Sequence, residues 1–357
     1  MRSSTKVGAA VLASVLTLVL CPTAAFAYGE GDKHQNNPPD GPSGGSSGNM
    51  LTARAGQTSI KVTQVSGGKS GKSPKSLAPV DPNWKPPACW YEPVATPEQL
   101  KAGVERLKAG GDLVPVTPSL SWGEQLMVDH YEKGEPQTGG DGYKDFNVGK
   151  DGKFWRGVIN ENMADDPRSY DCERNLFWQD ANTVPDDKNA PTPEVLAGYA
   201  YDKIKVPETE IELKPAARST VNLPTWVWLD KGTFDEVRVR AELPGTNVWA
   251  QTTAKPVSLH LEPGTDDAQT YPASGECVFN GDGSIGTPFT EGSSDAPPPC
   301  GITYRRSSNG APYQLKASVT WEISWVGTGG AGDDTLPDGI FETTQDMNVQ
   351  EIQAINR

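Results

Sequence analysis

The C-terminal part of the chain alternates between apolar and polar residues. Residues 313–325 are the clearest example, because every second residue is apolar and the residues between them are polar. Residues 236–243 alternate without a break, and residues 257–262 show the same pattern. A period of two is typical of strands that bury one face. We therefore expect residues 210–357 to form an all-β antiparallel sandwich.

Residues 83–209 lack this regular alternation and contain two signals for the start of a helix. Thr96 and Thr192 are each followed by proline and glutamate, which is the order expected of a capping hydroxyl and a first helical turn. The second helix is expected to end near Ile204. The sequence thus predicts a mixed α+β region. Because residues 221–229 are apolar on both faces, this region is the natural cover for the strand that they form.

The N-terminus has the three parts of a secretory signal peptide in residues 1–27. A basic start precedes an apolar run at residues 7–21, and Ala25-Phe26-Ala27 matches the small-x-small cleavage pattern. The run is too short to cross a bilayer, so we expect secretion with cleavage before Tyr28 and no membrane span. Residues 28–82 are rich in Gly, Ser, Pro and Lys, and they are predicted to be a disordered tether.

The net charge of the chain is −14, and cleavage of the basic leader makes it more negative. An acidic protein is a poor partner for nucleic acid. Residues 51–80 differ from the rest, because they contain five basic residues and no acid. This basic segment is a solvated linker or a contact for an anionic wall polymer or lipid. Its basic residues are Arg54, Lys61, Lys69, Lys72 and Lys75.

Four cysteines follow the leader, and in an oxidising compartment an even number of widely spaced cysteines predicts disulfides. Four cysteines allow three pairings, and spacing alone does not choose among them. Cys277 and Cys300 both lie in the expected sandwich and flank a loop rich in Gly, Ser, Asp and Pro. We therefore predict that these two pair with each other, and by elimination that Cys89 pairs with Cys172.

Several motifs together resemble a family of secreted actinobacterial proteins of unknown function. They are residues 87–93 (PACWYEP), 221–228 (VNLPTWVW), 300–308 (CGITYRRSS), 321–325 (WEISW) and 351–354 (EIQA). Such proteins often carry automatic names such as enoyl reductase or ATP/GTP-binding protein, and neither name implies a known activity. The resemblance implies a C-terminal domain of the PKD-like, immunoglobulin-like type. A tyrosine at a turn before a long alternating strand, as at Tyr304, is similar to the closing strands of that domain.

The sequence shows no recognisable nucleotide or nicotinamide site. Residues 68–70 and 71–73 both read Gly-Lys-Ser, but the earlier glycine of a phosphate loop is missing, and no strand or helix flanks them. No glycine-rich dinucleotide motif lies in a strand–helix unit either. We expect no cofactor.

A serine nucleophile is also poorly supported. Residues 44–48 match Gly-x-Ser-x-Gly, but they lie in the predicted tether rather than at a strand-to-helix turn. The three histidines of the chain are His34 in the tether, His130 after a helical segment, and His260 on the outward face of a strand. A Ser-His-Asp site is therefore not expected.

Acidic residues leave one catalytic alternative open. Residues 165–166, 186–187 and 266–267 are Asp-Asp pairs, and a glycan-directed hydrolase needs only two carboxyl groups at a suitable separation. Calcium is another alternative at a Gly-rich loop, although that loop departs from the EF-hand pattern. Its oxygen-bearing residues are Asp141, Asp145, Asn147 and Asp151.

Tryptophans divide into two groups. Those at alternating strand positions are expected in the core, namely Trp226, Trp228, Trp321 and Trp325. Trp84, Trp90 and Trp155 lie in loop-like contexts and are candidates for exposed rings that contact a ligand. The leading hypothesis is a secreted, non-catalytic protein that binds an extracellular protein or cell-wall polymer at the cell envelope. The alternative is the secreted hydrolase that uses acidic residues.

Overall fold

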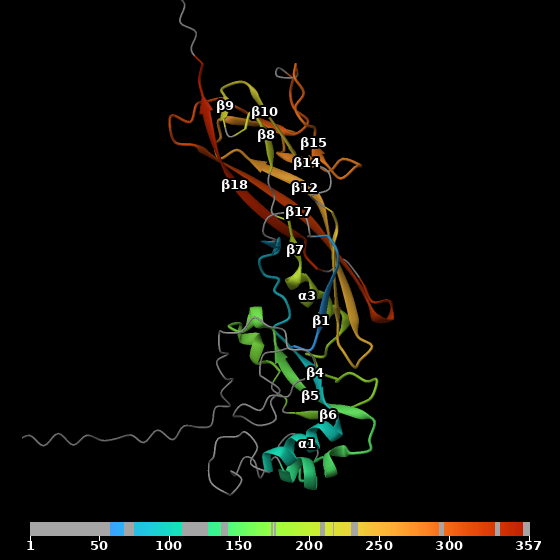
Figure 1. Ribbon diagram of the computed structural model, residues 1–357. Helices are drawn as coiled ribbons and strands as arrows, with labels where there is room; N and C mark the ends of the chain where they lie inside the picture. Colours follow the sequence, from blue (N-terminus) through green and yellow to red (C-terminus); the bar gives the residue numbers. More distant parts are fainter. Residues whose placement is uncertain are drawn as a thin grey trace, which may run out of the picture. The chain divides into compact units, whose positions relative to one another are not determined.

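In a computed structural model, the protein is predominantly β and nearly all of its strand pairs are antiparallel (Figure 1). All the described residues belong to one compact unit of the chain, residues 41–357. The described residues are 58–67, 75–108, 128–136, 142–172, 174, 176–207, 211–216, 218–229, 235–292, 296–332 and 336–352.

The largest sheet has eight strands, with the order β1-β11-β12-β17-β18-β3. β14 also pairs with β12, and β9 pairs in parallel with the C-terminal end of β18. The strands are β1 (Lys61–Ser66), β3 (Ala78–Pro79), β9 (Arg218–Thr220), β11 (Val237–Glu242), β12 (Trp249–Glu262), β14 (Glu276–Val278), β17 (Tyr313–Gly327) and β18 (Gly339–Gln350).

A second sheet of five strands has the order β13-β16-β10-β15, with β8 paired to β10. Buried residues of both sheets, such as Leu259 and Val319 of the large sheet and Val227 and Ile302 of the second, belong to one hydrophobic core. The strands are β8 (Glu212–Lys214), β10 (Pro224–Leu229), β13 (Ala268–Tyr271), β15 (Ile285–Gly286) and β16 (Gly301–Tyr304).

Two smaller sheets and the helices come mainly from residues 83–209. The three-stranded sheet contains β4 (Cys89–Ala95), β5 (Gly152–Ile159) and β6 (Phe177–Asp180), and the two-stranded sheet contains β2 (Lys75–Ser76) and β7 (Lys205–Val206). The helices are α1 (Pro97–Lys108), α3 (Pro193–Lys203), and the short η1 (Asp129–Lys133), η2 (Lys144–Asn147), η3 (Glu161–Met163), η4 (Pro167–Tyr170) and η5 (Thr328–Gly330).

The predicted alternation is confirmed in the large sheet. From Leu315 to Trp325, every second residue of β17 is buried, and the buried residues of β11 alternate in the same way. β12 differs from the expectation at one point. Its register with β17 shifts between Pro256 and Ser258, so one strand of 14 residues contains a bulge at Val257. The extra residue inverts the alternation, so the buried residues are even-numbered before the bulge (250, 252, 254 and 256) and odd-numbered after it (259 and 261).

Both predicted helix starts are confirmed. The Thr192 hydroxyl accepts a hydrogen bond from the backbone N–H of Val195, and α3 ends with Ile204 as its C-cap. α3 packs on the inner side of the large sheet, where the Thr252 hydroxyl donates to the Ala197 carbonyl at 2.9 Å. The hydrophobic core therefore runs across the boundary that was expected near residue 210.

The expected cover of β10 is wrong at Trp226. The Trp226 ring is buried against Phe289, with ring centroids 5.8 Å apart, and Phe289 lies in the loop between β15 and β16. This cover thus comes from within the β-rich part and not from residues 83–209. A loop without regular secondary structure has no periodic apolar pattern, so the sequence does not predict that Phe289 packs on Trp226.

The tether expected at residues 28–82 is also wrong where the structure describes it. Residues 61–66 and 75–79 contain β1, β2 and β3, and Ile60 is buried in the main core. Burial of Ile60 and pairing with distant strands supply the order that composition alone did not indicate. Residues 28–57 and 68–74, like the leader at 1–27, lie outside the described residues.

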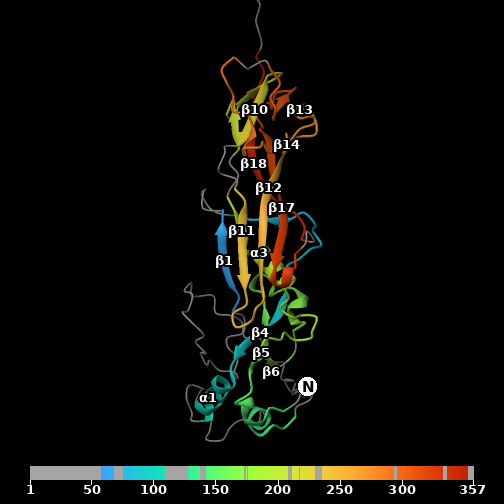
Figure 2. The same ribbon diagram turned by 90° about the vertical axis from the view of Figure 1, so that its right-hand side faces the viewer.

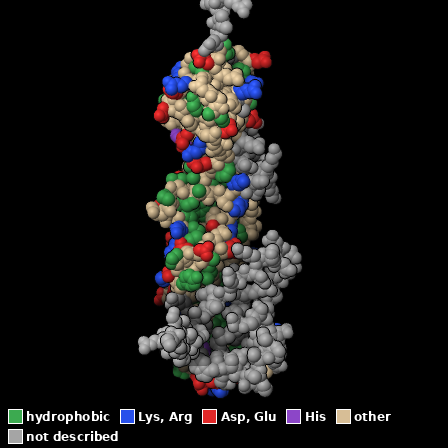
Figure 3. All heavy atoms as spheres, turned by 90° about the vertical axis from the view of Figure 1, so that its left-hand side faces the viewer, with side chains coloured by type: hydrophobic (Ala, Val, Ile, Leu, Met, Phe, Trp, Pro, Cys, Tyr) green, Lys and Arg blue, Asp and Glu red, His purple; other side chains and the backbone are tan. Residues whose placement is uncertain are grey.

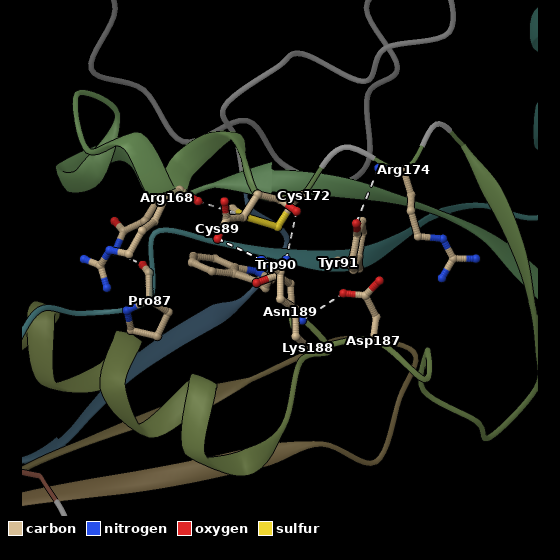
Figure 4. Close-up of a disulfide and its surroundings, with 12 residues drawn as sticks. Pro87, Cys89, Trp90, Tyr91, Arg168, Cys172, Arg174, Asp187, Lys188 and Asn189 are labelled. Carbon is tan, nitrogen blue, oxygen red and sulfur yellow. Dashed lines mark hydrogen bonds and ion pairs between the residues drawn. A yellow bond between two sulfur atoms is a disulfide. The ribbon is translucent and has the colours of Figure 1, made fainter. Parts of the chain in front are cut away.

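The structure contains the two disulfides that the sequence predicted. Cys89 at the start of β4 is joined to Cys172 just after η4, with Cα atoms 6.1 Å apart. Figure 4 shows this bridge beside Trp90 and Tyr91. Cys277 in β14 is joined to Cys300 before β16, with Cα atoms 5.6 Å apart. The second bridge therefore links the two large sheets to each other.

Candidate functional site at the β1 edge

β1 lies at one end of the large sheet, beside β11 (Figure 2). Among the described strands, β11 is the one that pairs with it. The first five residues of β1 are all exposed, including the side chains of Val62 and Val65 at 38% and 52%. An exposed edge strand presents unpaired backbone groups to which another chain can pair.

The register identifies which backbone groups of β1 point outward. The Leu243 N–H donates to the Val248 carbonyl, so Leu243 and every second residue before it in β11 bond toward β12. Arg240 and Glu242 therefore bond toward β1, where they face Thr63 and Lys61. It follows that the N–H and C=O groups of Val62 and Gln64 point away from β11. These four groups are the open edge.

The C-terminal end of the open edge is set by a bulge and a glycine. The register with β11 shifts between Gln64 and Ser66, and the Ser66 hydroxyl donates to the Glu236 carbonyl at 3.2 Å. Gly67 follows with a φ of +75°, and a Cβ there would lie 2.7 Å from the Glu236 oxygen. Only glycine fits this position, because the conformation is left-handed and the backbone approach is close. β1, and with it the open edge, therefore ends at Ser66.

The N-terminal end is held by a buried carboxylate, which we call the Glu92 anchor: Glu92 with its donors Thr58, Ser59 and Trp90. Glu92 lies in β4 and is 2% exposed. One oxygen accepts from the Thr58 hydroxyl and from Trp90 Nε1 at 2.6 Å. The other accepts from the Ser59 N–H and hydroxyl, each at 2.5 Å. The anchor fastens the start of β1 to the three-stranded sheet.

Arg156 faces Glu92 across the β4–β5 pair. Burial lowers the pKa of Arg156, and the negative charge of Glu92 opposes that change. A buried carboxylate is tolerable when donors and an opposite charge surround it. Together with the buried side chain of Ile60, the Glu92 anchor gives β1 a defined start. A strand held at both ends in an extended conformation has little ordering entropy left to lose on binding.

The tryptophans predicted as exposed contacts are not exposed. Trp90 is fully buried within the Glu92 anchor, and Trp155 in β5 is 3% exposed in the main core. Trp84 is half-buried, with its ring centroid 4.9 Å from that of Tyr201 in α3. That expectation was wrong because the Trp90 ring packs on Tyr199 of α3 and because β5, which contains Trp155, lies between β4 and β6 in the three-stranded sheet. The local sequence does not show these contacts.

Neither of the two histidines that the structure describes forms a Ser-His-acid relay. His260 Nδ1 lies 2.9 Å from a Glu276 oxygen, but the Ser258 hydroxyl donates to the other oxygen of the same carboxylate. In a catalytic triad the serine bonds to the imidazole instead. His130 is buried, and its Nδ1 lies 2.9 Å from the Glu135 carbonyl oxygen. His34 and the serine motif at residues 44–48 lie outside the described residues.

The Asp-Asp pairs contribute structural carboxylates. Asp187 accepts from the Asn189 N–H at 2.9 Å, and Asp267 forms an ion pair with Arg306. Asp145 of the suggested calcium loop pairs with Lys101, whereas Asp141 lies outside the described part. No cluster of three metal-ligating side chains occurs within the described ranges. The Gly-Lys-Ser repeats at residues 68–73 are likewise not described.

Asp166 is the best-defined of these acids. It caps η4, accepting from the Arg168 N–H at 3.0 Å, and it forms ion pairs with Arg168 and Lys85 at 2.9 and 3.1 Å. The Arg168 side chain, the Arg168 N–H and Lys85 hold the pKa of Asp166 well below its usual value of 3.8. Lys316 likewise lowers the pKa of Glu342. A general acid for glycoside cleavage needs the opposite shift.

The pKa of Asp166 leads to a pH-dependent prediction for stability. Because the pKa is lower in the folded state, the ionised group stabilises the fold above about pH 4, and this contribution is lost as the pH falls. Asp166→Asn keeps a capping oxygen but removes the charge. We expect wild type to be the more stable at pH 7 and the difference in urea midpoint to shrink steadily as the pH falls below about 4. A difference that stays constant with pH would contradict this assignment.

Comparison of the chain with protein-family models, curated proteins and solved structures found no match. On the face drawn in Figure 3, acidic and basic side chains are interspersed, and hydrophobic side chains gather near its middle. No helix in the described ranges has the length and hydrophobicity needed to cross a bilayer. The class that the structure supports is therefore a β-rich protein with two disulfides.

Sequence reasoning missed both parts of this site. Glu92 lies in a motif used only for resemblance, and nothing in its neighbourhood indicates that residues 58 and 59 are its partners. One signal was available: residues 59–62 alternate between polar and apolar, which is typical of a short strand. That signal was outweighed by the Gly- and Ser-rich composition around it.

Proposed function

We propose that this protein is secreted and acts as a non-catalytic binding or assembly component at the cell envelope, with the β1 edge as its binding element. The observation that carries the proposal is the combination of an exposed edge strand and a buried anchor. A strand whose backbone groups point outward binds an extended segment by adding it to the sheet. The partner would be an extracellular protein.

Secretion is supported by two independent features. The leader at residues 1–27 has the organisation of a signal peptide, and the four remaining cysteines form two disulfides. Disulfides of this kind persist in oxidising compartments.

A PKD-like, immunoglobulin-like sandwich is the fold that we propose for residues 210–357. The supporting observation is Tyr304, which is fully buried in β16 and stacks on Tyr313 at 5.4 Å. Its hydroxyl donates to the Pro263 carbonyl at the end of β12, 3.3 Å away. A tyrosine that bonds back to upstream backbone is common in such sandwiches.

Edge-blocking substitutions test the binding role. Val62→Pro removes an outward N–H while leaving the β1–β11 bonds of Lys61 and Thr63 intact, and proline is tolerated at such edge positions. Val62→Ala is the matched control, because it trims the side chain but keeps the N–H. We expect immobilised wild type and Val62→Ala to retain a partner from culture supernatant or cell-wall extract, and Val62→Pro to lose it.

The partner recovered in this way would then be purified and its affinity measured directly. We expect at least tenfold weaker binding to Val62→Pro, since strand addition depends on main-chain hydrogen bonds. Equal affinity for all three forms would refute the role of the β1 edge.

A further inference from the structure

We infer that the middle of β18 is a second strand-binding edge, and that it takes an extended, basic segment of a partner protein. In the large sheet, β11, β12 and β17 lie between β18 and β1. The inference goes beyond the proposed function, because it uses none of the residues of the β1 edge. Every residue of β18 belongs to the described part of the chain.

β18 is paired with β17 from Gly339 to Met347, but on its other side it is paired only near its two ends. β3 pairs with Gly339 and Ile340, and β9 pairs with residues 348–350. Among the described residues, none pairs with residues 341–347 on this side, at the margin of the sheet (Figure 1). We call residues 341–347 the β18 gap. A strand of ordinary length, about five or six residues, fits within it.

Hydrogen bonds at the two ends identify the backbone groups that point into the β18 gap. The Val80 N–H donates to the Asp338 carbonyl at 2.8 Å, and the Val221 N–H donates to the Gln350 carbonyl at 2.9 Å. Asp338 and Gln350 thus bond away from β17. The register with β17 has no bulge, so every second residue between them bonds in the same direction. The outward N–H and C=O groups of the gap are therefore those of Glu342, Thr344 and Asp346.

The β18 gap lies in an acidic part of the chain. Residues 338–351 contain four acidic residues and no basic one. The side chains of Glu342, Thr344 and Asp346 are all exposed, because they share the face of β18 that points away from the core. An added strand places its side chains beside those that it faces. Lysine or arginine opposite Glu342 and Asp346 would therefore meet a complementary charge, which steers association and fixes the register.

The neighbouring strand neutralises only part of this charge. Lys316 of β17 is shared between two carboxylates, those of Glu262 at 3.1 Å and Glu342 at 3.0 Å. Asp346 accepts a hydrogen bond from the uncharged Gln314 side chain at 2.7 Å. One cation thus serves two acids, and the third acid has a neutral neighbour.

The strands that bound the β18 gap add one basic residue. Arg218 of β9 faces Asn348, which lies outside the gap. β3 consists of Ala78 and Pro79, which carry no charge. The acids of the gap therefore remain in excess, and a basic partner is favoured.

A second copy of this chain is a poor occupant of the β18 gap. In an antiparallel pair of two β18 strands, the register that uses all three outward-bonding residues of each copy is centred on Thr344. That register puts Glu342 of each copy opposite Asp346 of the other. Like charges directly opposite each other destabilise a strand pair. The acids thus disfavour self-association, as charged residues commonly do at sheet edges.

A labelled heptapeptide provides the probe: Val-Lys-Val-Thr-Val-Lys-Val, with a fluorescein at its N-terminus. Its lysines face Glu342 and Asp346 when its threonine faces Thr344. A matched peptide has glutamate at both lysine positions, and a third has proline in place of the threonine. Binding to the full chain is followed by fluorescence polarisation at about 50 and 300 mM salt. We expect the lysine peptide to bind at least tenfold more tightly than the glutamate peptide, less tightly at high salt, and the proline peptide not to bind.

Two sets of variants separate the backbone from the charge. Thr344→Pro removes an outward N–H and leaves the bonds to β17 intact, and Thr344→Ala is its matched control. We expect Thr344→Pro to weaken binding of the lysine peptide at least tenfold, and Thr344→Ala less than threefold. Glu342→Gln/Asp346→Asn is expected to remove most of the preference for lysine over glutamate, whereas Glu105→Gln, at an exposed position of α1, leaves it unchanged. Circular dichroism and thermal unfolding verify that each variant is folded.

The outcomes distinguish this inference from the proposed function. Val62→Pro blocks the β1 edge, and we expect it to bind the lysine peptide as wild type does. A loss of binding confined to Val62→Pro would place the peptide at the β1 edge, so the inference would be overturned while the proposed function stands. Equal binding of the lysine and glutamate peptides would refute the basic preference. If wild type sediments as a dimer and Thr344→Pro as a monomer, the gap takes a second copy and the inference is likewise overturned.

Discussion

Replacing Glu92 with alanine is expected to lower the free energy of unfolding by about 3–5 kcal/mol. The substitution removes the acceptor for Trp90 Nε1 and for the Ser59 N–H, and it leaves Arg156 without the carboxylate that faces it. Buried donors that lose their acceptor are costly, and the loss of a negative charge facing Arg156 adds to the cost. The loss is measured from urea unfolding followed by tryptophan fluorescence.

Glutamine is not an adequate replacement for Glu92. Each carboxylate oxygen accepts one N–H, from Trp90 on one side and from Ser59 on the other. A glutamine amide has one acceptor and one donor group, so one of these N–H groups would face another donor. We expect Glu92→Gln to lower the free energy of unfolding by about 1–3 kcal/mol, which is the penalty of one unsatisfied buried group.

Two controls separate this effect from a general loss of charge. Glu105 is exposed on α1, and Glu105→Gln is expected to change stability by less than about 0.5 kcal/mol. Hydrogen exchange gives a local measurement, because loss of the Glu92 anchor should speed exchange in β1 before global unfolding. If Glu92→Ala were as stable as wild type and protected β1 equally, the anchor would have no role.

Removing the Cys89–Cys172 disulfide is the second large change. In the chain-entropy description, it is expected to lower the free energy of unfolding by about 4.5 kcal/mol. The two cysteines are 83 residues apart, whereas Cys277 and Cys300 are 23 apart. Because its loop is shorter, removing the Cys277–Cys300 bridge is expected to lower the free energy of unfolding by about 3 kcal/mol. The order of the two losses follows from loop length, since a longer loop confines the unfolded chain more.

The double variants Cys89→Ala/Cys172→Ala and Cys277→Ala/Cys300→Ala allow the comparison without free thiols. In urea unfolding at equal protein concentration, we expect wild type to have the highest midpoint. The Cys277/Cys300 variant should come next, and the Cys89/Cys172 variant should have the lowest midpoint. Non-reducing peptide mapping of wild type verifies the pairing. A reversed order would mean that contacts made in the folded state by the Cys277–Cys300 bridge, which joins the two sheets, outweigh the entropic difference.

Several local elements of this protein can be predicted from the amino-acid sequence. Strands β11 and β17 follow from alternation, because one face of each is buried and the other is not. The ends of α3 follow from Thr192 and Ile204, since capping depends on residues within one turn. The disulfide pairs follow from where the four cysteines stand relative to the expected regions of the chain. In each case the interaction that decides the structure lies close in sequence or is covalent.

Long-range contacts, by contrast, fix where residues 58–66 pair and which side chains fill the interior around them. The Ser66 hydroxyl bonds to a carbonyl 170 residues away, and Thr58 and Ser59 reach a carboxylate more than 30 residues away. Trp90 is buried because Glu92 accepts its N–H and α3 covers its ring, with Tyr199 at 4.9 Å. Such contacts depend on chain segments that meet only after folding, so they leave no periodic signal in the residues that make them.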